Sequence, residues 1–182
     1  MSSRFSKGQL SNLKNRGILF DANILIYLFW PTGGQEFEKT YSSLYNSLLK
    51  LNAAFYVDFI IISEVVNRAI RIEYGNYLWE TSQEAENYSF KRFRDSEDGK
   101  ELLEDIYMII EGSILGNFQI TGKGFNEMEI REFLKVDCLD FSDKAIELIC
   151  KENNFVLLTN DSDFRNSDVD ILSLNKQFLL SN

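Results

Sequence analysis

The pattern of apolar and polar positions along the chain predicts five short strands. Each is a mostly apolar run bounded by polar or turn-forming residues, as expected for strands buried in a sheet. The runs lie at 18–20, 55–57, 118–121, 155–158 and 170–174. The first run is the most sharply bounded, because Gly17 precedes it and Asp21 ends it.

Between these runs, apolar residues recur at the three- and four-residue intervals of amphipathic helices. The expected helices cover 23–29, 35–51, 59–74, 77–94, 99–111, 127–134 and 143–152. A loop is expected at 30–34, which contains the only proline of the chain and two adjacent glycines. Gly75 and Asn76 are expected to break the helical pattern a second time.

The order of these elements is typical of an α/β protein with a parallel sheet and helices on both faces. We predict a three-layer α/β/α sandwich around a central, mainly parallel sheet, formed by a single domain over residues 1–182. The charged stretch 77–112 is predicted as an inserted pair of helices. Its alternating charges suit either helices packed with one solvated face or a surface for a partner or substrate.

The composition fits one folded domain. The chain has 182 residues, of which 45% are hydrophobic and 14% aromatic, enough for a substantial core. No apolar run approaches the roughly 20 residues of a membrane-spanning helix, and the polar start does not resemble a signal peptide. Cys138 and Cys150 lack a CxxC spacing and are expected as small core residues of a reduced, cytoplasmic protein.

The chain contains no histidine, which limits its chemistry. Any hydrolysis would use carboxylates, hydroxyls, lysines or water bound to a metal ion. The net charge of -9 argues against a general nucleic-acid coat but allows a nuclease, because bound cations neutralise clustered acids. The first sixteen residues differ, because they contain four basic residues and no acidic one. They are expected to be either a frayed, solvated terminus or an arm that contacts phosphates.

Four acidic residues fall where predicted elements begin or end. Asp21 and Asp161 directly follow strands. Asp143 opens the helix that leads into the strand before Asp161, and Glu64 lies early in its own helix. The carboxyl ends of parallel strands share one edge of a sheet, which is where ligands bind in open α/β folds. We therefore expect these four side chains to converge.

Each of these acids also suits a purely structural role. The three aspartates could cap helices or stabilise turns. Glu64 could form an ordinary i,i+4 ion pair with Arg68. Asp140 competes with Asp143 for the third acidic position, and the register of the apolar residues that follow favours Asp143. Lys123, Lys144 and Arg68 could contact phosphates or be plain surface charges.

Convergent carboxylates without basic partners would repel one another, which raises some of their pKa values. Magnesium or manganese would relieve this repulsion, because both ions favour oxygen ligands. A pair of such ions can activate a water molecule and stabilise the leaving oxygen in phosphodiester cleavage. The acidic positions and the absence of histidine therefore agree on metal-dependent chemistry.

Four segments, in this order, resemble the PIN-domain ribonucleases. They are 19–25 (LFDANIL), 63–68 (SEVVNR), 140–146 (DFSDKAI) and 158–164 (LTNDSDF), and the likeness extends over about residues 17–175. Many small members of this family are toxins of the VapC type. The stretch 77–112 and the strongly acidic charge depart from those compact toxins.

The resemblance implies a PIN-like fold and a metal-dependent endoribonuclease. It implies that Asp21, Glu64, Asp143 and Asp161 are the catalytic acids and bind Mg²⁺ or Mn²⁺, with Asp163 as an additional metal-binding acid. Thr159 resembles the hydroxyl found beside the family's site. The substrate implied is RNA, and the partners implied for a toxin are an antitoxin protein and a second copy in a homodimer.

Two other functions compete with this reading. A catalytically inactive PIN-like module would keep the fold and bind RNA or a protein partner. A phosphatase of the haloacid-dehalogenase kind also starts with a strand that ends in aspartate. That chemistry needs a second aspartate two positions later, where this chain has Asn23, so we rank it last.

Overall fold

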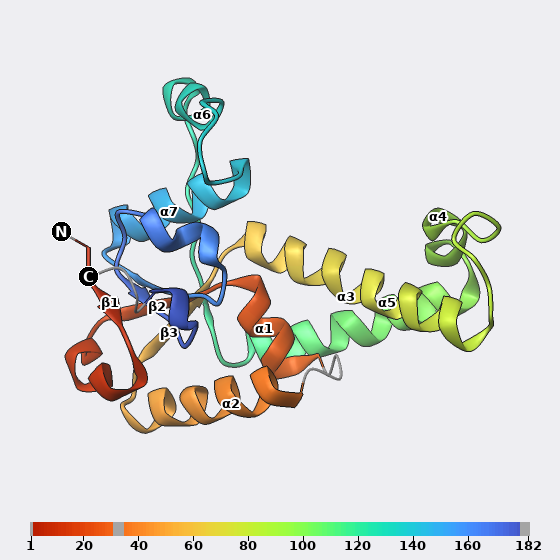
Figure 1. Ribbon diagram of the computed structural model, residues 1–182, viewed down its shortest axis with the longest axis horizontal. Helices are drawn as coiled ribbons and strands as arrows, with labels where there is room; N and C mark the ends of the chain where they lie inside the picture. Colours follow the sequence, from red (N-terminus) through yellow and green to blue (C-terminus); the bar gives the residue numbers. More distant parts are fainter. Residues whose placement is uncertain (1, 31–34, 179–182) are drawn as a thin grey trace.

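The computed structural model describes residues 2–30 and 35–178, which form an α/β fold around a parallel sheet (Figure 1). The sheet has six strands in the order β1-β6-β5-β2-β3-β4, and each neighbouring pair is parallel. The strands are β1 (Arg4–Phe5), β2 (Gly17–Phe20), β3 (Ala54–Val57), β4 (Gln119–Ile120), β5 (Val156–Leu158) and β6 (Ile171–Leu172). The predicted α/β fold is therefore confirmed.

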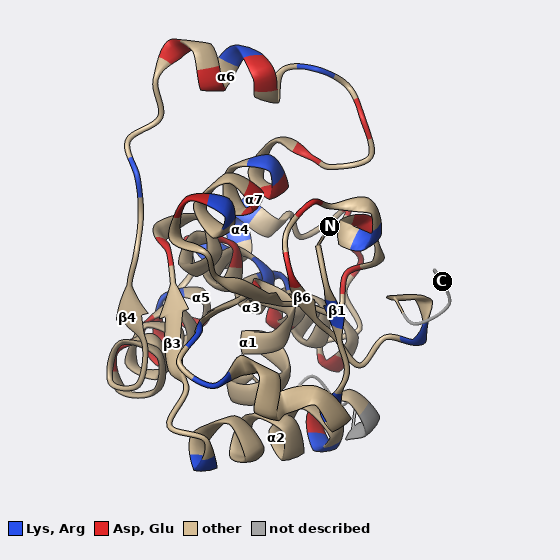
Figure 2. Ribbon diagram, turned by 90° about the vertical axis from the view of Figure 1, so that its left-hand side faces the viewer, with Lys and Arg blue, Asp and Glu red and all other residues tan. Residues whose placement is uncertain are grey.

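Helices cover both faces of this sheet. Helices α1 and α2 lie on one side and α7 on the other, while α6 stands away from the body (Figures 1 and 2). The α-helices are α1 (Ala22–Phe29), α2 (Gln35–Lys50), α3 (Phe59–Glu80), α4 (Phe90–Arg94), α5 (Glu97–Ile109), α6 (Glu127–Phe133) and α7 (Phe141–Asn153). Shorter helical turns are η1 (Lys7–Leu13), η2 (Ile110–Leu115), η3 (Ser162–Asn166) and η4 (Lys176–Phe178). Positions 31–34 of the expected loop lie outside the described residues.

The central strand β2 explains why the fold forms around this segment. Ile18, Leu19 and Phe20 are all completely buried between β3 and β5. The Phe20 ring packs against the rings of Phe55 and Phe118, with centroid distances of 5.0 and 4.9 Å. Burying these side chains removes a large apolar area from water and places the residue after Phe20 at the carboxyl edge of the sheet.

The start of the chain joins the sheet, so the prediction of a frayed terminus is wrong, while a contact with phosphates stays a prediction for the exposed Lys7 and Lys14. Residues Arg4 and Phe5 form β1, which pairs with β6 at the edge of the sheet. The Arg4 guanidinium donates hydrogen bonds to the carbonyls of Ser167 (2.5 Å) and Val169 (2.8 Å). Arg4, which we assigned to solvent or phosphate, therefore attaches β1 to the segment before β6.

The break that we predicted at Gly75 and Asn76 is also wrong, because α3 runs unbroken through both residues. On one side of the glycine, the Tyr74 hydroxyl donates a hydrogen bond to the carbonyl of Tyr88 (2.6 Å). On the other side, the Tyr77 ring stacks on the Tyr88 ring at 5.3 Å. These contacts offset the low helix propensity of glycine, which costs about 1 kcal/mol relative to alanine.

The prediction of one continuous helix over 77–94 is also wrong. Its first turn belongs to α3, and the chain then turns through Ser82, whose φ of 51° lies in the left-handed region. A new helix, α4, begins only after Ser89, whose hydroxyl accepts a hydrogen bond from the Arg92 amide. Helices α3 and α5 lie side by side as an arm with α4 at its end (Figure 1).

Two further expectations concern burial and membranes. Cys150 is buried as predicted, but Cys138 is exposed, because it lies in the irregular segment between α6 and α7 rather than in the core. None of the helices in the described part of the chain is long and apolar enough to cross a membrane.

Candidate active site

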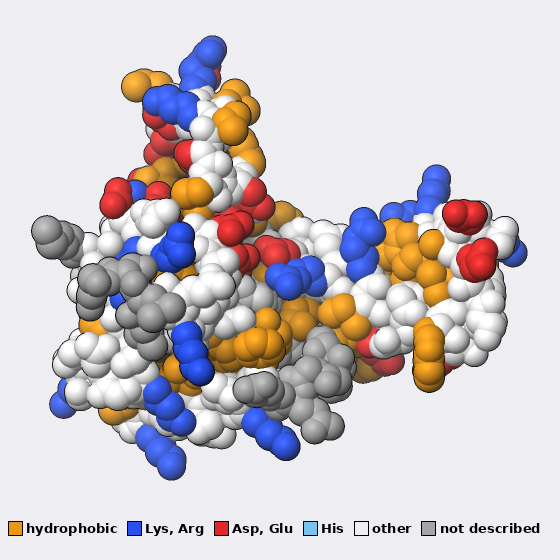
Figure 3. All heavy atoms as spheres, viewed as in Figure 1, with side chains coloured by type: hydrophobic (Ala, Val, Ile, Leu, Met, Phe, Trp, Pro, Cys, Tyr) orange, Lys and Arg blue, Asp and Glu red, His pale blue; other side chains and the backbone are white. Residues whose placement is uncertain are grey.

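A cavity of about 370 Å³, here named the acidic cavity, opens at the carboxyl edge of the sheet. Acidic side chains gather on this face between α7 and the start of α3 (Figure 3). The structure brings together all five acids singled out in the sequence. The lining residues are Asp21, Asn23, Ile60, Ser63, Glu64, Asn67, Arg68, Asp140, Ser142, Asp143, Asp161 and Asp163.

The sheet topology explains why residues so far apart in the sequence meet here. Strands β5, β2 and β3 are neighbours and all point the same way. Asp21 follows β2, the segment after β5 carries Asp161, and β3 leads into α3, which carries Glu64. Helix α7 runs back into β5, so its first turn, with Asp143, lies at the same edge. Ligand sites of parallel sheets lie at this edge.

Asp21 is the most deeply placed of the acids, with 5% of its surface exposed. Its Oδ1 accepts a hydrogen bond from the Ala22 amide (2.6 Å), so it also caps α1. Its Oδ2 accepts hydrogen bonds from the Asn23 side-chain amide (2.7 Å) and from the Thr159 hydroxyl (2.5 Å). The capping role and a place in the cavity are therefore compatible, and the carboxylate is held in one orientation.

Burial and neighbouring negative charges raise the pKa values of two acids in this cavity, Asp21 and Asp143. Burial, and after it the charges of Glu64 and Asp161, raise the pKa of Asp21 to about 6, although the hydrogen bonds from Thr159 and the Ala22 amide act in the opposite direction. Burial also raises the pKa of Asp143 to about 7, together with the nearby charges of Asp140, Asp21 and Asp161. Charge of the same sign in a small volume disfavours every further negative charge.

Asp140 and Asp143, which competed for one position in the sequence, have different roles. Asp140 is the N-cap of α7, where its Oδ1 accepts hydrogen bonds from the Asp143 amide and the Ser142 hydroxyl, both at 2.8 Å. Asp143 lies in the first turn of the helix, and both residues line the cavity. Because Asp140 already satisfies the helix start, Asp143 is not needed as a cap.

Asp161 and Asp163 lie at the outer side of the cavity, where both are exposed. Asp161 caps the turn η3 by accepting a hydrogen bond from the Asp163 amide (3.0 Å). Its own amide donates a hydrogen bond to the Thr159 hydroxyl oxygen (2.9 Å), the same group that contacts Asp21. Thr159 is completely buried and therefore fixes two of the acids relative to each other.

Glu64 projects from a helix face that the sequence reasoning recognised only in part. Ile60, Ser63, Glu64 and Asn67 follow the i, i+3, i+4, i+7 spacing and all line the cavity. This spacing was visible in the sequence, but of these four residues only Glu64 was proposed for the site. The predicted ion pair also forms, since the Arg68 guanidinium lies 3.1 Å from a Glu64 carboxylate oxygen.

The donor set fits a hard divalent cation. The acidic cavity offers carboxylate, amide and hydroxyl oxygens without any nitrogen or sulfur ligand of the soft kind. Within residues 2–30 and 35–178, no three His, Cys, Asp or Glu side chains already stand together as a ligand set. Mg²⁺ needs no such set, because it keeps several waters and is commonly held by one or two carboxylates.

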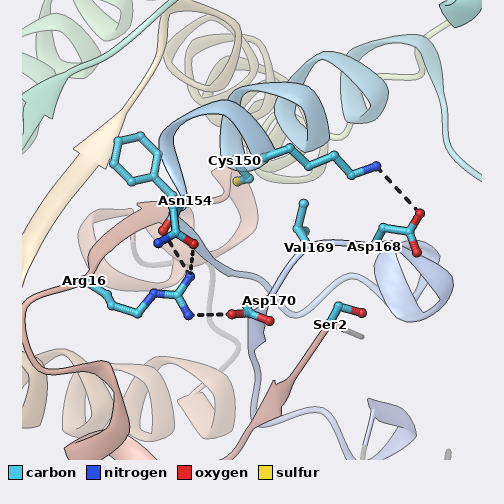
Figure 4. A pocket seen from close by; sticks show the side chains of 9 residues that line it. Ser2, Arg16, Cys150, Asn154, Asp168, Val169 and Asp170 are labelled. Carbon is cyan, nitrogen blue, oxygen red and sulfur yellow. Dashed lines mark hydrogen bonds and ion pairs between the residues drawn. The ribbon is translucent and has the colours of Figure 1, made fainter.

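A second cavity, of about 390 Å³, lies at the opposite, amino edge of the sheet, and we name it the amino-edge cavity. Here the charges are paired (Figure 4). Arg16 contacts Asp170 at 2.5 Å and Asn154 at 3.0 Å, and Lys151 lies 3.9 Å from Asp168. This arrangement ties the segments before β2, β5 and β6 together, and among the described residues that line the cavity two basic side chains balance two acidic ones.

Comparison with known proteins identifies a matching family and a similar solved structure. Residues 18–169 match the family described as PIN domain. No curated protein matches the chain. Among solved structures it is similar to the crystal structure of VapBC2 from Rickettsia felis bound to a DNA fragment from their promoter. That match has a TM-score of 0.48 and 17% sequence identity, and it covers 86% of this chain and 98% of the other.

Proposed function

The chain belongs to the PIN-domain family, and from this premise we propose that it is a metal-dependent endoribonuclease that hydrolyses phosphodiester bonds in RNA. One observation carries the proposal. The four acids expected from the family resemblance, with Asp163, line a single cavity at the carboxyl edge of the sheet.

We assign Mg²⁺ or Mn²⁺ to this cavity, held by Asp21, Glu64, Asp143 and Asp161 with Asp163 beside them. A bound ion of this kind lowers the pKa of a water molecule and neutralises charge on the phosphate and the leaving oxygen. The raised pKa values of Asp21 and Asp143 support the assignment, because a divalent cation relieves the burial and repulsion that raise them.

The protein's own contribution is orientation. Thr159 and Asn23 hold the carboxylate of Asp21, and the η3 turn holds that of Asp161. Side chains fixed in this way lose little freedom when they bind a cation, and supporting hydrogen bonds of this type commonly tune metal affinity 10- to 100-fold. The chain has no histidine, so no imidazole can act as general base.

Cleavage of a labelled single-stranded RNA by the purified protein tests this proposal. With Mn²⁺ or Mg²⁺ we expect cleavage at internal positions, and excess EDTA should stop it. Asp21→Asn should abolish cleavage while the circular dichroism spectrum stays that of the parent. Glu132→Gln, on the exposed helix α6, is the matched control and should cut like the parent. If Asp21→Asn cut as fast as the parent, the assignment would be wrong.

The competing function is a catalytically inactive module that binds RNA or a protein partner. The observation that favours it is that the described acids do not already form a metal-ligand set. Isothermal titration with Mn²⁺ separates the two functions. Binding at micromolar to millimolar metal that is lost in Asp21→Asn supports the nuclease, and no binding by the parent supports the inactive module.

Three finer predictions of the family resemblance concern biological role. We propose that the chain acts as the toxin of a toxin–antitoxin pair, that an antitoxin protein binds it, and that it forms a homodimer. A gene for a small DNA-binding protein next to this one, whose product co-purifies with this chain and restores growth when both are expressed, would support the first two. Light scattering of the purified protein tests the third.

A further inference from the structure

The acidic cavity contains a single basic side chain among the described residues that line it, that of Arg68. Six carboxylates line the same cavity, from Asp21, Glu64, Asp140, Asp143, Asp161 and Asp163. RNA is a polyanion, so a cavity of this charge repels it unless cations are present. A basic side chain inside the acidic cavity therefore matters more for RNA binding than a basic side chain elsewhere on the surface.

The structure separates Arg68 from the two other basic residues that the sequence offered for phosphate contacts. The Lys144 ammonium is buried, donates hydrogen bonds to the carbonyls of Phe133 (3.2 Å) and Lys135, and pairs with Asp137. It therefore holds the segment after α6 against α7 and does not line the acidic cavity.

Lys123 also forms ion pairs outside the acidic cavity. Its ammonium lies 2.7 Å from a Glu129 oxygen and 2.5 Å from a Glu152 oxygen, and its side chain is only 13% exposed. These two ion pairs connect α6 to α7, and Lys123 does not line the acidic cavity. Of the three candidates, only Arg68 can meet a phosphate there.

Arg68 also has the freedom that phosphate binding requires. Its side chain is 44% exposed, and within residues 2–30 and 35–178 its one ion pair is with Glu64, at 3.1 Å. An exposed pair of this type contributes little to stability, so a competing anion can replace it. The planar guanidinium can donate two parallel hydrogen bonds to a phosphate, which a lysine ammonium does not match.

The position of Arg68 on α3 fixes where that phosphate would lie. Arg68 is four residues beyond Glu64 on the same helix face, which is a rise of about 6 Å along the axis. A phosphate bound by Arg68 is thus displaced toward the arm of α3 from a phosphate that lies at the four acids. One RNA strand can place neighbouring phosphates at both positions.

We propose that Arg68 is a substrate-binding residue that holds an RNA phosphate next to the one being cleaved. This inference rests on the proposed nuclease function. It also assigns a second role to Glu64, which pairs with Arg68 in the absence of ligands and exchanges that partner when the cavity fills with a cation and RNA.

Arg68→Ala tests the proposal, with Arg131→Ala as the matched control. Arg131 forms the same kind of exposed i,i+4 ion pair, with Glu127 on α6, but does not line the acidic cavity. With labelled single-stranded RNA and Mn²⁺, we expect Arg68→Ala to raise KM about tenfold and leave kcat largely unchanged, because a charge-assisted phosphate contact is lost. Arg68→Lys should restore part of the loss.

The salt dependence of KM separates phosphate binding by Arg68 from a purely structural role, because only the loss of a phosphate contact changes it. The slope of log KM against log salt concentration should fall by about 0.7 in Arg68→Ala, the contribution of one phosphate contact to a single strand. Titration with Mn²⁺ alone should show equal or tighter binding by Arg68→Ala than by the parent, because Glu64 is released from its ion pair. The Arg131→Ala variant should match the parent in all three measurements.

An unchanged KM and salt slope in Arg68→Ala, or equal changes in Arg131→Ala, would overturn the proposal. A loss of kcat with no change in KM would do the same. If the parent fails to cleave RNA at all, the proposed function fails, and the same comparison is made by fluorescence anisotropy with the intact RNA. Weaker binding by Arg68→Ala would then still support the assigned contact, and equal binding would reject it.

Discussion

The two cavities at opposite edges of the sheet have similar volumes, about 370 and 390 Å³, but their charged side chains are paired in one and mostly of like sign in the other. At the amino edge, Arg16 and Asp170 neutralise each other at 2.5 Å. At the carboxyl edge, the described lining residues include six carboxylates and one arginine. A fold gains nothing from gathering like charges, because their repulsion and burial cost free energy.

The comparison therefore separates a cavity whose charges are paired from the cavity for which we propose catalysis. Burial would raise the pKa of Asp170, but the hydrogen bonds from Arg16 and from the Ser3 amide lower it overall. The pKa of Asp143 is instead raised to about 7, by burial and by its acidic neighbours. Opposite pKa shifts of two aspartates at opposite edges of the sheet predict opposite responses to the same substitution.

The largest expected effect is on RNA cleavage, and one substitution at each edge measures it. Asp143→Asn is expected to lower kcat/KM in Mn²⁺ by about 100-fold or more, because bound metal contributes several kcal/mol of transition-state stabilisation. The kcat/KM of Asp170→Asn is expected to stay close to that of the parent, because Asp170 lies at the amino edge of the sheet. Equal losses in the two variants would contradict the division between the edges.

The next effect concerns Thr159, which supports the acidic cavity without being one of its acids. Thr159→Val keeps the shape of the side chain but removes the hydroxyl that contacts Asp21 and the Asp161 amide. We expect Mn²⁺ affinity to fall about 10- to 100-fold, the usual effect of losing a hydrogen bond that orients a metal ligand. Calorimetry measures it, with Thr81→Val at the end of α3 as the control; an unchanged affinity would show that the hydroxyl is dispensable.

A smaller effect is expected on the stability of the metal-free protein. The folded-state pKa of Asp143 is about 7, above the unfolded value of about 3.8, so the folded protein binds this proton more tightly. The contribution to the free energy of unfolding is complete below pH 3.8 and is lost as pH rises to about 7. Asp143→Asn should therefore be more stable than the parent at pH 8, by about 1–2 kcal/mol after solvent screening.

Urea unfolding in EDTA at pH 4.5, 6 and 8 measures this difference. The gap between Asp143→Asn and the parent should widen with pH and should shrink when saturating Mn²⁺ is added to the parent. A gap that is the same at all three pH values would mean that the charge of Asp143 does not destabilise the fold.

The smallest effect belongs to the amino edge and has the opposite sign. Asp170→Asn should lower the free energy of unfolding at pH 7 by about 1 kcal/mol, because it breaks a partly exposed ion pair with Arg16. Since the folded-state pKa of Asp170 is lowered, this contribution is present above the unfolded value and is lost as pH falls through the lowered one. Urea unfolding should thus find the variant and the parent converging in acid; a variant as stable as the parent at pH 7 would remove the structural role.

How far the site could be predicted depends on how local each signal is. Asp21 and Asp161 could be placed from the chain alone, because each follows a buried apolar run and parallel strands share one edge. Thr159 and Asp163 entered only through the resemblance to the PIN family. Asn23 and Ser142 were missed as lining residues, since nothing in their local sequence distinguishes a residue that faces a cavity from one that faces water. Asn67 was also missed, although its helical spacing from Glu64 was visible in the sequence.

The sequence by itself determined the central strand β2, the α/β order of elements and the carboxylates at the ends of those elements. These features depend on short apolar runs and the polar residues beside them, which act within a few positions. The tertiary structure decided that Arg4 joins the sheet, that α3 continues through Gly75, and that Arg68 rather than Lys123 or Lys144 lines the acidic cavity. Each of those outcomes depends on contacts between segments distant in the chain, whose free energies exceed the local preferences that a sequence displays.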